Sequence, residues 1–258
     1  RSEMEEFIYD EDEVLESTDV CSKTRWISSP LCESTTVTKQ RIVLAIDLDE
    51  TMISAQLINP HTPSSQIVVH PHLDHFHTEF TVKGQTQAMI VYLRPHLTQF
   101  LRKVSMWFDV VLFTASMPEY ADVILDHIEN EIIGSKIFSS RLYRGQCTEV
   151  IQYSSFSFTQ QKQYVKDLRV LGKDLDSVVI IDNSPVAYDW NQGNALPIST
   201  WTHYSGNSQN CSELSQLLPF LHEVYIGKDI RKPLHEYREQ FTRNEILPEE
   251  NHSACVIS

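Results

Sequence analysis

The sequence predicts an α/β protein built around a central, mainly parallel β-sheet. Three continuous apolar runs, over residues 41–46, 110–113 and 178–181, are each typical of a strand that is buried on both faces of such a sheet. Helical patterns lie between and after these runs, and strands that alternate with helices indicate a parallel sheet. The chain has 258 residues, of which 41% are hydrophobic and 22% are charged, as in an ordinary globular protein.

Helices are predicted on both sides of the second strand and after the third. Before the second strand, one helical face contains Leu97, Phe100, Leu101 and Val104. After that strand and a turn at Pro118, another face contains Val123, Ile124, His127 and Ile128. Two late helices are expected over residues 214–221 and 230–241.

Two insertions interrupt this alternation. Phe80 and Val82 alternate with polar residues, residues 83–85 form a turn, and residues 88–93 run extended, so residues 66–93 predict an inserted β-hairpin. Residues 139–165, which are rich in tyrosine and phenylalanine, predict a second insertion made of strands or loops.

Charge distinguishes the first residues from the rest. The net charge is −14, and residues 1–19 contain nine acidic residues against Arg1 alone. Together with the Ser/Thr-rich stretch up to residue 39, this is typical of a solvated, disordered tail, with a regulatory arm as the alternative. No basic stripe indicates direct nucleic-acid binding, and no apolar run reaches the ~18 residues of a membrane-spanning helix. Because the chain begins with Arg1 instead of Met, we expect a fragment.

Polar residues follow each of the three apolar strands. Asp47 and Asp49 follow the first, residues 114–116 (Thr-Ala-Ser) follow the second, and residues 182–184 (Asp-Asn-Ser) follow the third. Ligands bind at the carboxyl ends of strands in open α/β sheets, so we expect these side chains to share one crevice. A single carboxylate after a strand is often only a helix cap, but three polar strand ends favour a site.

The pair Asp47 and Asp49 has a specific chemical use. Two carboxylates that leave a strand end in different directions can divide the work, since one can attack while the other handles a proton. Clustered carboxylates also repel one another. A hard cation such as Mg²⁺, which prefers oxygen ligands, relieves that repulsion.

Several ordered motifs resemble a known family. Residues 47–51 (Asp-Leu-Asp-Glu-Thr) fit the DxDx(T/V) signature of haloacid dehalogenase (HAD)-type phosphatases. Residues 113–116, 164–168, 181–185 and 191–201 follow in the order of the FCP/SCP branch, the phosphatases of the RNA polymerase II C-terminal domain and their relatives. The resemblance implies a HAD-like Rossmannoid three-layer sandwich. It covers roughly residues 40–225 and leaves 226–258 as a C-terminal helix and tail.

The resemblance also implies a role for each matching residue. Asp47 matches the nucleophile that forms an aspartyl-phosphate. Asp49 matches the general acid that protonates the leaving serine or threonine oxygen and then activates water. Thr51 would fix Asp49 and its loop, and Thr114 would donate a hydrogen bond to a phosphate oxygen. Lys166 would neutralise charge on the phosphoryl group and on Asp47, as phosphoryl transfer requires.

A Mg²⁺ site and a further phosphate contact are implied as well. Asp47, Asp182 and Asn183, with the backbone carbonyl of Asp49, would hold the ion. Arg144 matches a phosphate-contacting arginine, although its surroundings match less closely. The alternative for Arg144 is a surface ion pair, which contributes little.

Members of this family recognise their substrate with an apolar pocket that receives a proline near the phosphoserine. The matching positions are all apolar, namely Leu57, Phe80, Val82, Met89 and Met117. They form either such a pocket or the packing of the hairpin onto the core. The sequence favours neither of these two interpretations over the other.

A histidine run lies in the first insertion, at residues 70–77. In an extended segment, His70 and His72 share a face, as do His75 and His77, which allows a zinc site. No paired cysteines accompany the run, so a polar surface loop is favoured.

The five cysteines include no CxxC pair, which favours a reducing compartment. The last four residues, Cys255-Val256-Ile257-Ser258, fit a C-a-a-X box for farnesylation, with coincidence as the alternative. A single farnesyl group on Cys255, without a polybasic flank, would give weak and transient membrane association.

Three classes of function remain. The first is a Mg²⁺-dependent protein serine/threonine phosphatase, nuclear or cytoplasmic or membrane-associated. Its substrate would be the RNA polymerase II C-terminal domain or another regulatory phosphoprotein at a membrane. The second is a small-metabolite phosphatase, which a hairpin without a large lid domain disfavours. The third is a non-catalytic phosphoprotein-binding module, which the intact Asp47, Asp49, Lys166 and Asp182 disfavour.

Overall fold

The computed structural model describes residues 41–63, 66–153, 160–204, 212–227 and 229–246. The chain divides into the units 1–38 and 39–258, and only the second contains described residues. The expected tail over residues 1–39 and the C-terminal box with Cys255 lie outside them.

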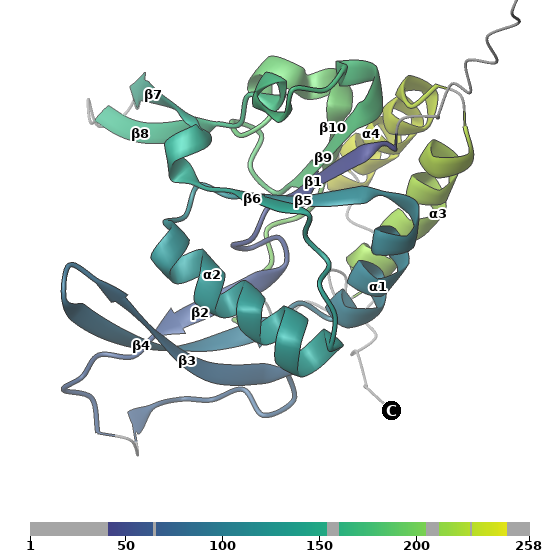
Figure 1. The fold of residues 1–258 in the computed structure, drawn as a ribbon. Helices are drawn as coiled ribbons and strands as arrows, with labels where there is room; N and C mark the ends of the chain where they lie inside the picture. Colours follow the sequence, from purple (N-terminus) through teal and green to yellow (C-terminus); the bar gives the residue numbers. More distant parts are fainter. Residues whose placement is uncertain (1–40, 64–65, 154–159, 205–211, 228, 247–258) are drawn as a thin grey trace, which may run out of the picture. The chain divides into compact units, whose positions relative to one another are not determined.

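A five-stranded sheet forms the centre of the described unit (Figure 1). Its strand order is β10-β9-β1-β5-β6, and all four pairings are parallel. The three predicted strands are confirmed as β1 (Val43–Ile46), β5 (Asp109–Phe113) and β9 (Val178–Asp182). The flanking strands β6 (Ser140–Leu142) and β10 (Ala195–Pro197) were not predicted as strands, because each has only three residues.

Hydrophobic layers cover both faces of this sheet, as the predicted three-layer α/β fold requires. Alternate residues of β1 point to opposite faces. Leu44 and Ile46 pack in a large cluster with the helices α1 to α4, whereas Val43 and Ala45 pack in a smaller cluster on the other face. The second cluster is completed by the short 3₁₀ segments Leu168–Leu171 and Leu175–Ser177.

The first long helix, α1 (Leu97–Trp107), buries the four predicted residues. Helix α2 (Pro118–His127) continues into a π-helical turn, Ile128–Ile133. Two details of its prediction were wrong. Pro118 is the first helical residue, where proline is favoured, and the buried face is shifted toward Ala121 and Leu125, leaving Val123 and His127 half-buried.

The two late helices are confirmed and extend beyond the predicted limits. They are α3 (Glu213–Ile226) and α4 (Arg231–Ile246). The expected boundary after residue 225 falls at the end of α3. Helix α4 packs on α3 and β10, and Leu234 and Tyr237 belong to the main hydrophobic cluster.

The predicted hairpin is confirmed as β3 (His75–Val82) and β4 (Gln85–Leu93). Lys83 and Gly84 have φ of 52° and 77°, as a two-residue hairpin turn of the I′ type requires. Strand β2 (Ile53–Leu57), which was not predicted, completes a three-stranded antiparallel sheet. Figure 1 shows α2 between this sheet and the central one.

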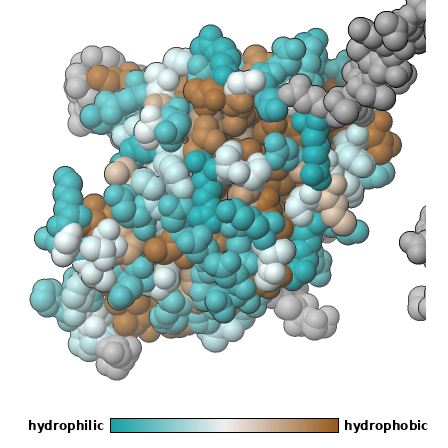
Figure 2. Space-filling model, viewed as in Figure 1, coloured by the Kyte–Doolittle hydropathy of each residue, from teal (hydrophilic) through white to brown (hydrophobic). Residues whose placement is uncertain are grey.

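The second predicted insertion is also confirmed, as the antiparallel hairpin of β7 (Thr148–Tyr153) and β8 (Gln160–Val165). Apolar side chains reach an otherwise largely hydrophilic exterior at several points (Figure 2). Within the described part of the chain, no helix combines the length and the apolar character needed to cross a membrane.

Candidate active site

The polar residues after β1, β5 and β9 meet at one edge of the central sheet. These strands are direct neighbours and run parallel, so their carboxyl ends lie side by side. Backbone hydrogen bonds extend this order past the strands, since Asp47 N donates to Ile181 O at 3.0 Å and Thr114 N donates to Leu142 O at 3.0 Å. The three polar strand ends therefore lie together at this edge of the sheet.

Lys166 joins two of these carboxylates. It follows β8, and its backbone N–H donates to Ala187 O at 2.7 Å. Its Nζ lies 2.5 Å from Asp47 Oδ1 and 2.5 Å from Asp182 Oδ2. Burial lowers the pKa of Lys166, but the charges of Asp182 and Asp47 and the hydrogen bonds to them more than reverse that effect and raise it. The two carboxylates therefore favour the charged form of this buried lysine.

Asp49 is held by different partners. Ser116 Oγ donates to its Oδ2 at 2.6 Å, and Tyr120 OH donates to its Oδ1 at 2.5 Å. Burial raises the pKa of Asp49, while these two hydrogen bonds lower it in part. The net rise favours the protonated carboxyl that a general acid needs. Tyr120 was not predicted, and its place in helix α2 gave no signal in the sequence.

A tight loop presents these residues. Met52 N and Ile53 N both donate to Leu48 O, at 2.9 and 3.1 Å. Glu50 adopts a left-handed φ of 62°, which is costly for a non-glycine residue. The carbonyl of Glu50 accepts from Trp201 N at 2.8 Å, which helps to fix the turn.

Thr51 is fully buried and links this loop to β9. Its Oγ1 donates to Asn183 Oδ1 at 3.1 Å and accepts from Asn183 N at 3.2 Å. Asn183 Nδ2 donates to Glu50 Oε2 at 3.3 Å and to Thr200 Oγ1 at 3.1 Å. Thr51 thus fixes the loop as expected, but it does so through Asn183 rather than by direct contact with Asp49.

Arg94 supports the same loop and was not singled out in the sequence. Its Nη1 donates to Thr51 O at 3.1 Å and to Ser199 O at 3.0 Å, and its Nη2 lies 2.6 Å from Glu213 Oε2. The side chain of Arg94 is 0% exposed. This arginine follows the apolar run of β4, which is the only sequence signal that it would be buried.

The charges of the site fit a divalent cation. Asp47 and Asp182 place two carboxyl groups against the ammonium of Lys166, and these three residues are 6%, 1% and 2% exposed. Burial raises the pKa of Asp182, which opposes its ionisation. A hard dication would neutralise this excess, and the carboxylates together with amide or backbone oxygens are its preferred ligands. Across the described ranges, no group of three or more His, Cys, Asp or Glu residues is placed to bind a metal, so Asn183 and a backbone oxygen would be needed.

Thr114 and Arg144 border the crevice. Thr114 is 1% exposed, and its Oγ1 accepts from Ser116 N at 3.0 Å, which leaves the hydroxyl proton to donate. Arg144 is exposed, and its N and Nε donate to the carbonyls of Ser116 and Ala115 at 3.0 and 2.6 Å. Its guanidinium carbon lies 5.1 Å from the centre of the Tyr164 ring. Arg144 is thus anchored to the turn that follows β5, beside Thr114.

The five apolar positions of the expected substrate pocket do not form one group. Met89 is fully buried and belongs to the main core, so for Met89 the packing alternative holds, because it lies on the inward face of β4. Phe80 is partly buried against the core, and its ring contacts the Tyr120 ring at 5.4 Å. Val82 is half-buried, and only Leu57 and Met117 are well exposed, at 58% and 40%.

The histidine run does not form a zinc site in the described structure, where no suitable ligand group exists. His72 and His77 are exposed, as the favoured surface-loop reading expects. His70 instead packs edge-on to His203, with ring centres 5.5 Å apart. His203 stacks on Tyr92 and shares a 2.8 Å hydrogen bond with Ser54.

The chain matches the model of the family described as NLI interacting factor-like phosphatase over residues 42–231. It is 37% identical over 202 residues to Nuclear envelope morphology protein 1 of Saccharomyces cerevisiae, which covers 76% of this chain and 42% of that protein. It is 33% identical over 221 residues to CTD nuclear envelope phosphatase 1B of Danio rerio, which covers 81% of this chain and 79% of that protein.

A solved structure of the fission yeast RNA polymerase II CTD phosphatase Fcp1 aligns with 83% of this chain and 68% of that one, with a TM-score of 0.46 and 19% identity. The chain spans less than half the length of the two yeast proteins named Nuclear envelope morphology protein 1, at 42% and 35%.

Proposed function

The chain belongs to the NLI interacting factor-like phosphatase family, and we propose that it is a Mg²⁺-dependent protein serine/threonine phosphatase with Asp47 as its nucleophile. The observation that carries the proposal is the contrast between two aspartates one residue apart. Asp47 is paired with the ammonium of Lys166, whereas Asp49 accepts only hydroxyl hydrogen bonds and has a raised pKa. Asp47, beside a cation, is suited to act as the nucleophile, and Asp49 is suited to carry a proton.

In the first step, a carboxylate oxygen of Asp47 attacks the phosphorus while the bond to the serine or threonine oxygen breaks. Asp49 delivers its proton to that leaving oxygen. In the second step, the now ionised Asp49 accepts a proton from water as the water oxygen attacks the aspartyl-phosphate. This step releases inorganic phosphate and restores both carboxyl groups.

The remaining residues position and neutralise the phosphoryl group. Lys166 holds Asp47 in place and offers positive charge at the attacked centre. Thr114, directly after β5, and Arg144, which follows β6 and hydrogen-bonds to the turn after β5, would contact the outer phosphate oxygens. Asp47, Asp182 and Asn183 with the carbonyl of Asp49 would hold Mg²⁺, which stabilises the negative charge that accumulates on a transferring phosphoryl group.

The substrate is proposed to be a phosphorylated protein. The names of several relatives contain both the term CTD and the term nuclear envelope. That combination supports the RNA polymerase II C-terminal domain as one candidate substrate. It also supports the second, a regulatory phosphoprotein at the nuclear membrane. Farnesylation of Cys255 would provide weak attachment to such a membrane.

Hydrolysis of p-nitrophenyl phosphate with Mg²⁺ or with EDTA tests the proposal, using the wild type, Asp47→Asn and Asp174→Asn. Asp174 is an exposed aspartate just before β9, so it is a matched control for the same chemical change. We expect activity that needs Mg²⁺, is lost in Asp47→Asn and is kept in Asp174→Asn. A folded wild type that binds a phosphopeptide without any turnover would instead support the non-catalytic binding module.

A further inference from the structure

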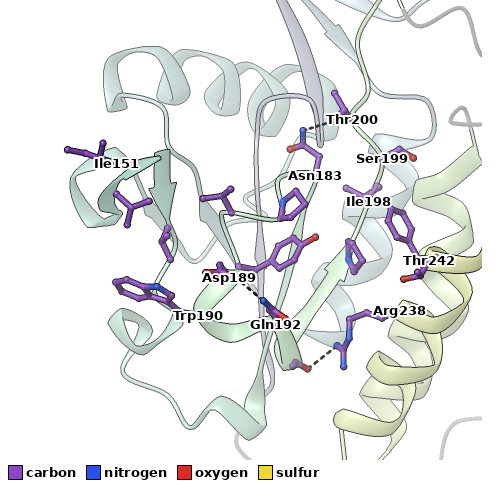
Figure 3. Close-up of a pocket in the computed structure, with 18 residues that line it drawn as sticks. Ile151, Asn183, Asp189, Trp190, Gln192, Ile198, Ser199, Thr200, Arg238 and Thr242 are labelled. Atoms are coloured by element: carbon purple, nitrogen blue, oxygen red, sulfur yellow. Dashed lines mark hydrogen bonds between the residues drawn. The ribbon is translucent and has the colours of Figure 1, made fainter. Parts of the chain in front are cut away.

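A large groove begins at Asn183, the residue that follows Asp182 at the active-site edge. Its volume is about 1130 Å³, which exceeds most small-molecule pockets of about 300–1,000 Å³. Asn183 and Thr200 line one end of it (Figure 3). Ile151 and Trp190 form one wall, and helix α4 forms the opposite wall with Arg238 and Thr242.

The wall made by Ile151 and Trp190 is unusually apolar for an exposed surface. Ile151 in the β7–β8 hairpin is 52% exposed, and Trp190 in the segment Asp189–Asn194 is 47% exposed. Single exposed apolar residues are normal, but here two large ones line the same groove. Exposed aromatic side chains beside a site are typical anchors for a binding partner.

The charged side chains of the groove already have partners. Arg238 Nη1 donates to Gly193 O and Ala195 O, both at 3.1 Å, and Asp189 Oδ1 accepts from Gln192 at 2.9 Å. Among the residues that the structure describes, Arg238 and Asp189 are the charged ones in its lining. Their partners are uncharged and fix the two side chains against the groove lining.

Of the five apolar positions on the opposite side of the catalytic centre, only Leu57 and Met117 are well exposed, at 58% and 40%. Met89 is buried in the core, and the Phe80 ring packs against Tyr120, which itself holds Asp49. The groove, by contrast, is continuous with the catalytic edge through Asn183, whose side chain bonds Thr200 on the groove lining.

From these observations we propose that the groove binds an extended stretch of the substrate polypeptide next to the phosphorylated residue. Its occupant carries a large apolar side chain that packs against Trp190 and Ile151. The proposal rests on the proposed phosphatase function and assigns its specificity to the β7–β8 side. The substrate class is thus a phosphoprotein with an aliphatic or aromatic residue within a few positions of the phosphoserine or phosphothreonine.

The test compares two phosphoserine peptides, one with leucine at each of the four positions on either side and one with alanine there. The kcat/KM for each is divided by the kcat/KM for p-nitrophenyl phosphate, which needs no groove. The variants are Trp190→Ala, Ile151→Thr and the control Met106→Gln. Met106 is 57% exposed on α1 and lies outside both the catalytic site and the groove.

We expect the wild type and Met106→Gln to prefer the leucine peptide about tenfold. In Trp190→Ala and Ile151→Thr, that preference should fall to threefold or less, while thermal unfolding is unchanged. A wild-type preference that survives in both groove variants would overturn the proposal, as would equal use of the two peptides by the wild type. A folded wild type that leaves p-nitrophenyl phosphate intact would contradict the phosphatase function itself, and this inference with it.

Discussion

Lys166 Nζ lies 2.5 Å from Asp47 Oδ1, in a position where the lysine side chain is only 2% exposed. The same nitrogen lies 2.5 Å from Asp182 Oδ2. One buried cation thus joins the strand ends of β1 and β9 and lies directly beside the proposed nucleophile.

Removal of this cation should damage both activity and folding. Lys166→Met leaves Asp47 and Asp182 buried without a counter-charge, and breaking such a pair costs about 3–5 kcal/mol of unfolding free energy. We expect turnover to fall at least about a hundredfold. Urea unfolding and steady-state kinetics measure the two effects. Lys162→Met, at an exposed ion pair on β8, should change neither, and a stable, active Lys166→Met would contradict the assigned role.

Tyr120 should set the pH range of the general acid. Its hydroxyl hydrogen bond lowers the pKa of Asp49, so Tyr120→Phe removes that effect and raises the pKa further. A general acid works while it is protonated. The upper limb of the kcat/KM profile for a phosphoserine peptide should therefore move to higher pH, whereas Tyr225→Phe, on an exposed part of α3, should leave it in place. A shift to lower pH would count against Asp49 as the acid.

At neutral pH, Asp49 should also lower the free energy of unfolding. Because its folded-state pKa is raised above the unfolded value, the folded state binds the proton more tightly. The contribution of Asp49 to the free energy of unfolding is therefore most favourable below the pKa that Asp49 has in the unfolded state. This contribution is lost as pH rises through the pKa that Asp49 has in the folded state. In EDTA at neutral pH, Asp49→Asn should be more stable than the wild type by about 1 kcal/mol. This difference in unfolding free energy should shrink at acid pH. Urea unfolding at several pH values measures it, and a difference that grows toward acid pH would contradict the prediction.

Magnesium should stabilise the fold through the same excess of carboxylates. A ligand at about a hundred times its dissociation constant adds about 2.7 kcal/mol, so thermal unfolding should shift upward with Mg²⁺ concentration. Asp182→Asn should lose most of this shift, while the exposed Asp174→Asn should keep it. If Mg²⁺ leaves the unfolding temperature of the wild type unchanged, the assigned metal ligands are wrong.

The hydrophobic periodicity of the sequence was sufficient to predict the main architecture. The apolar runs that became β1, β5 and β9 and the buried face of α1 are long and regular, so local pattern and tertiary packing agree. Strands β6 and β10 have three residues each, which is too short to give a period. The face of α2 was misplaced because its burial depends on packing against the β2–β4 sheet, which no local pattern records.

The site was predictable where chemistry is carried by motifs at strand ends. The geometry brings together the positions expected of Asp47, Asp182 and Lys166. Tyr120 and Arg94 could not be predicted, since both act through contacts across long sequence separations. The inward direction of Met89 depends on which face of β4 meets the core, and the register of a hairpin alone does not decide this.

The most direct test of the central claim is to identify where the phosphoryl group goes during turnover. Asp49→Asn lacks the base of the second step, so it should accumulate the covalent intermediate when mixed with p-nitrophenyl phosphate, whose leaving group needs little protonation. We predict that acid-quenched protein analysed by mass spectrometry carries one phosphoryl group on the peptide with Asp47, and none in the double variant Asp47→Asn/Asp49→Asn. A phosphoryl group on another residue, or none at all in a protein that still releases nitrophenol, would contradict Asp47 as the nucleophile.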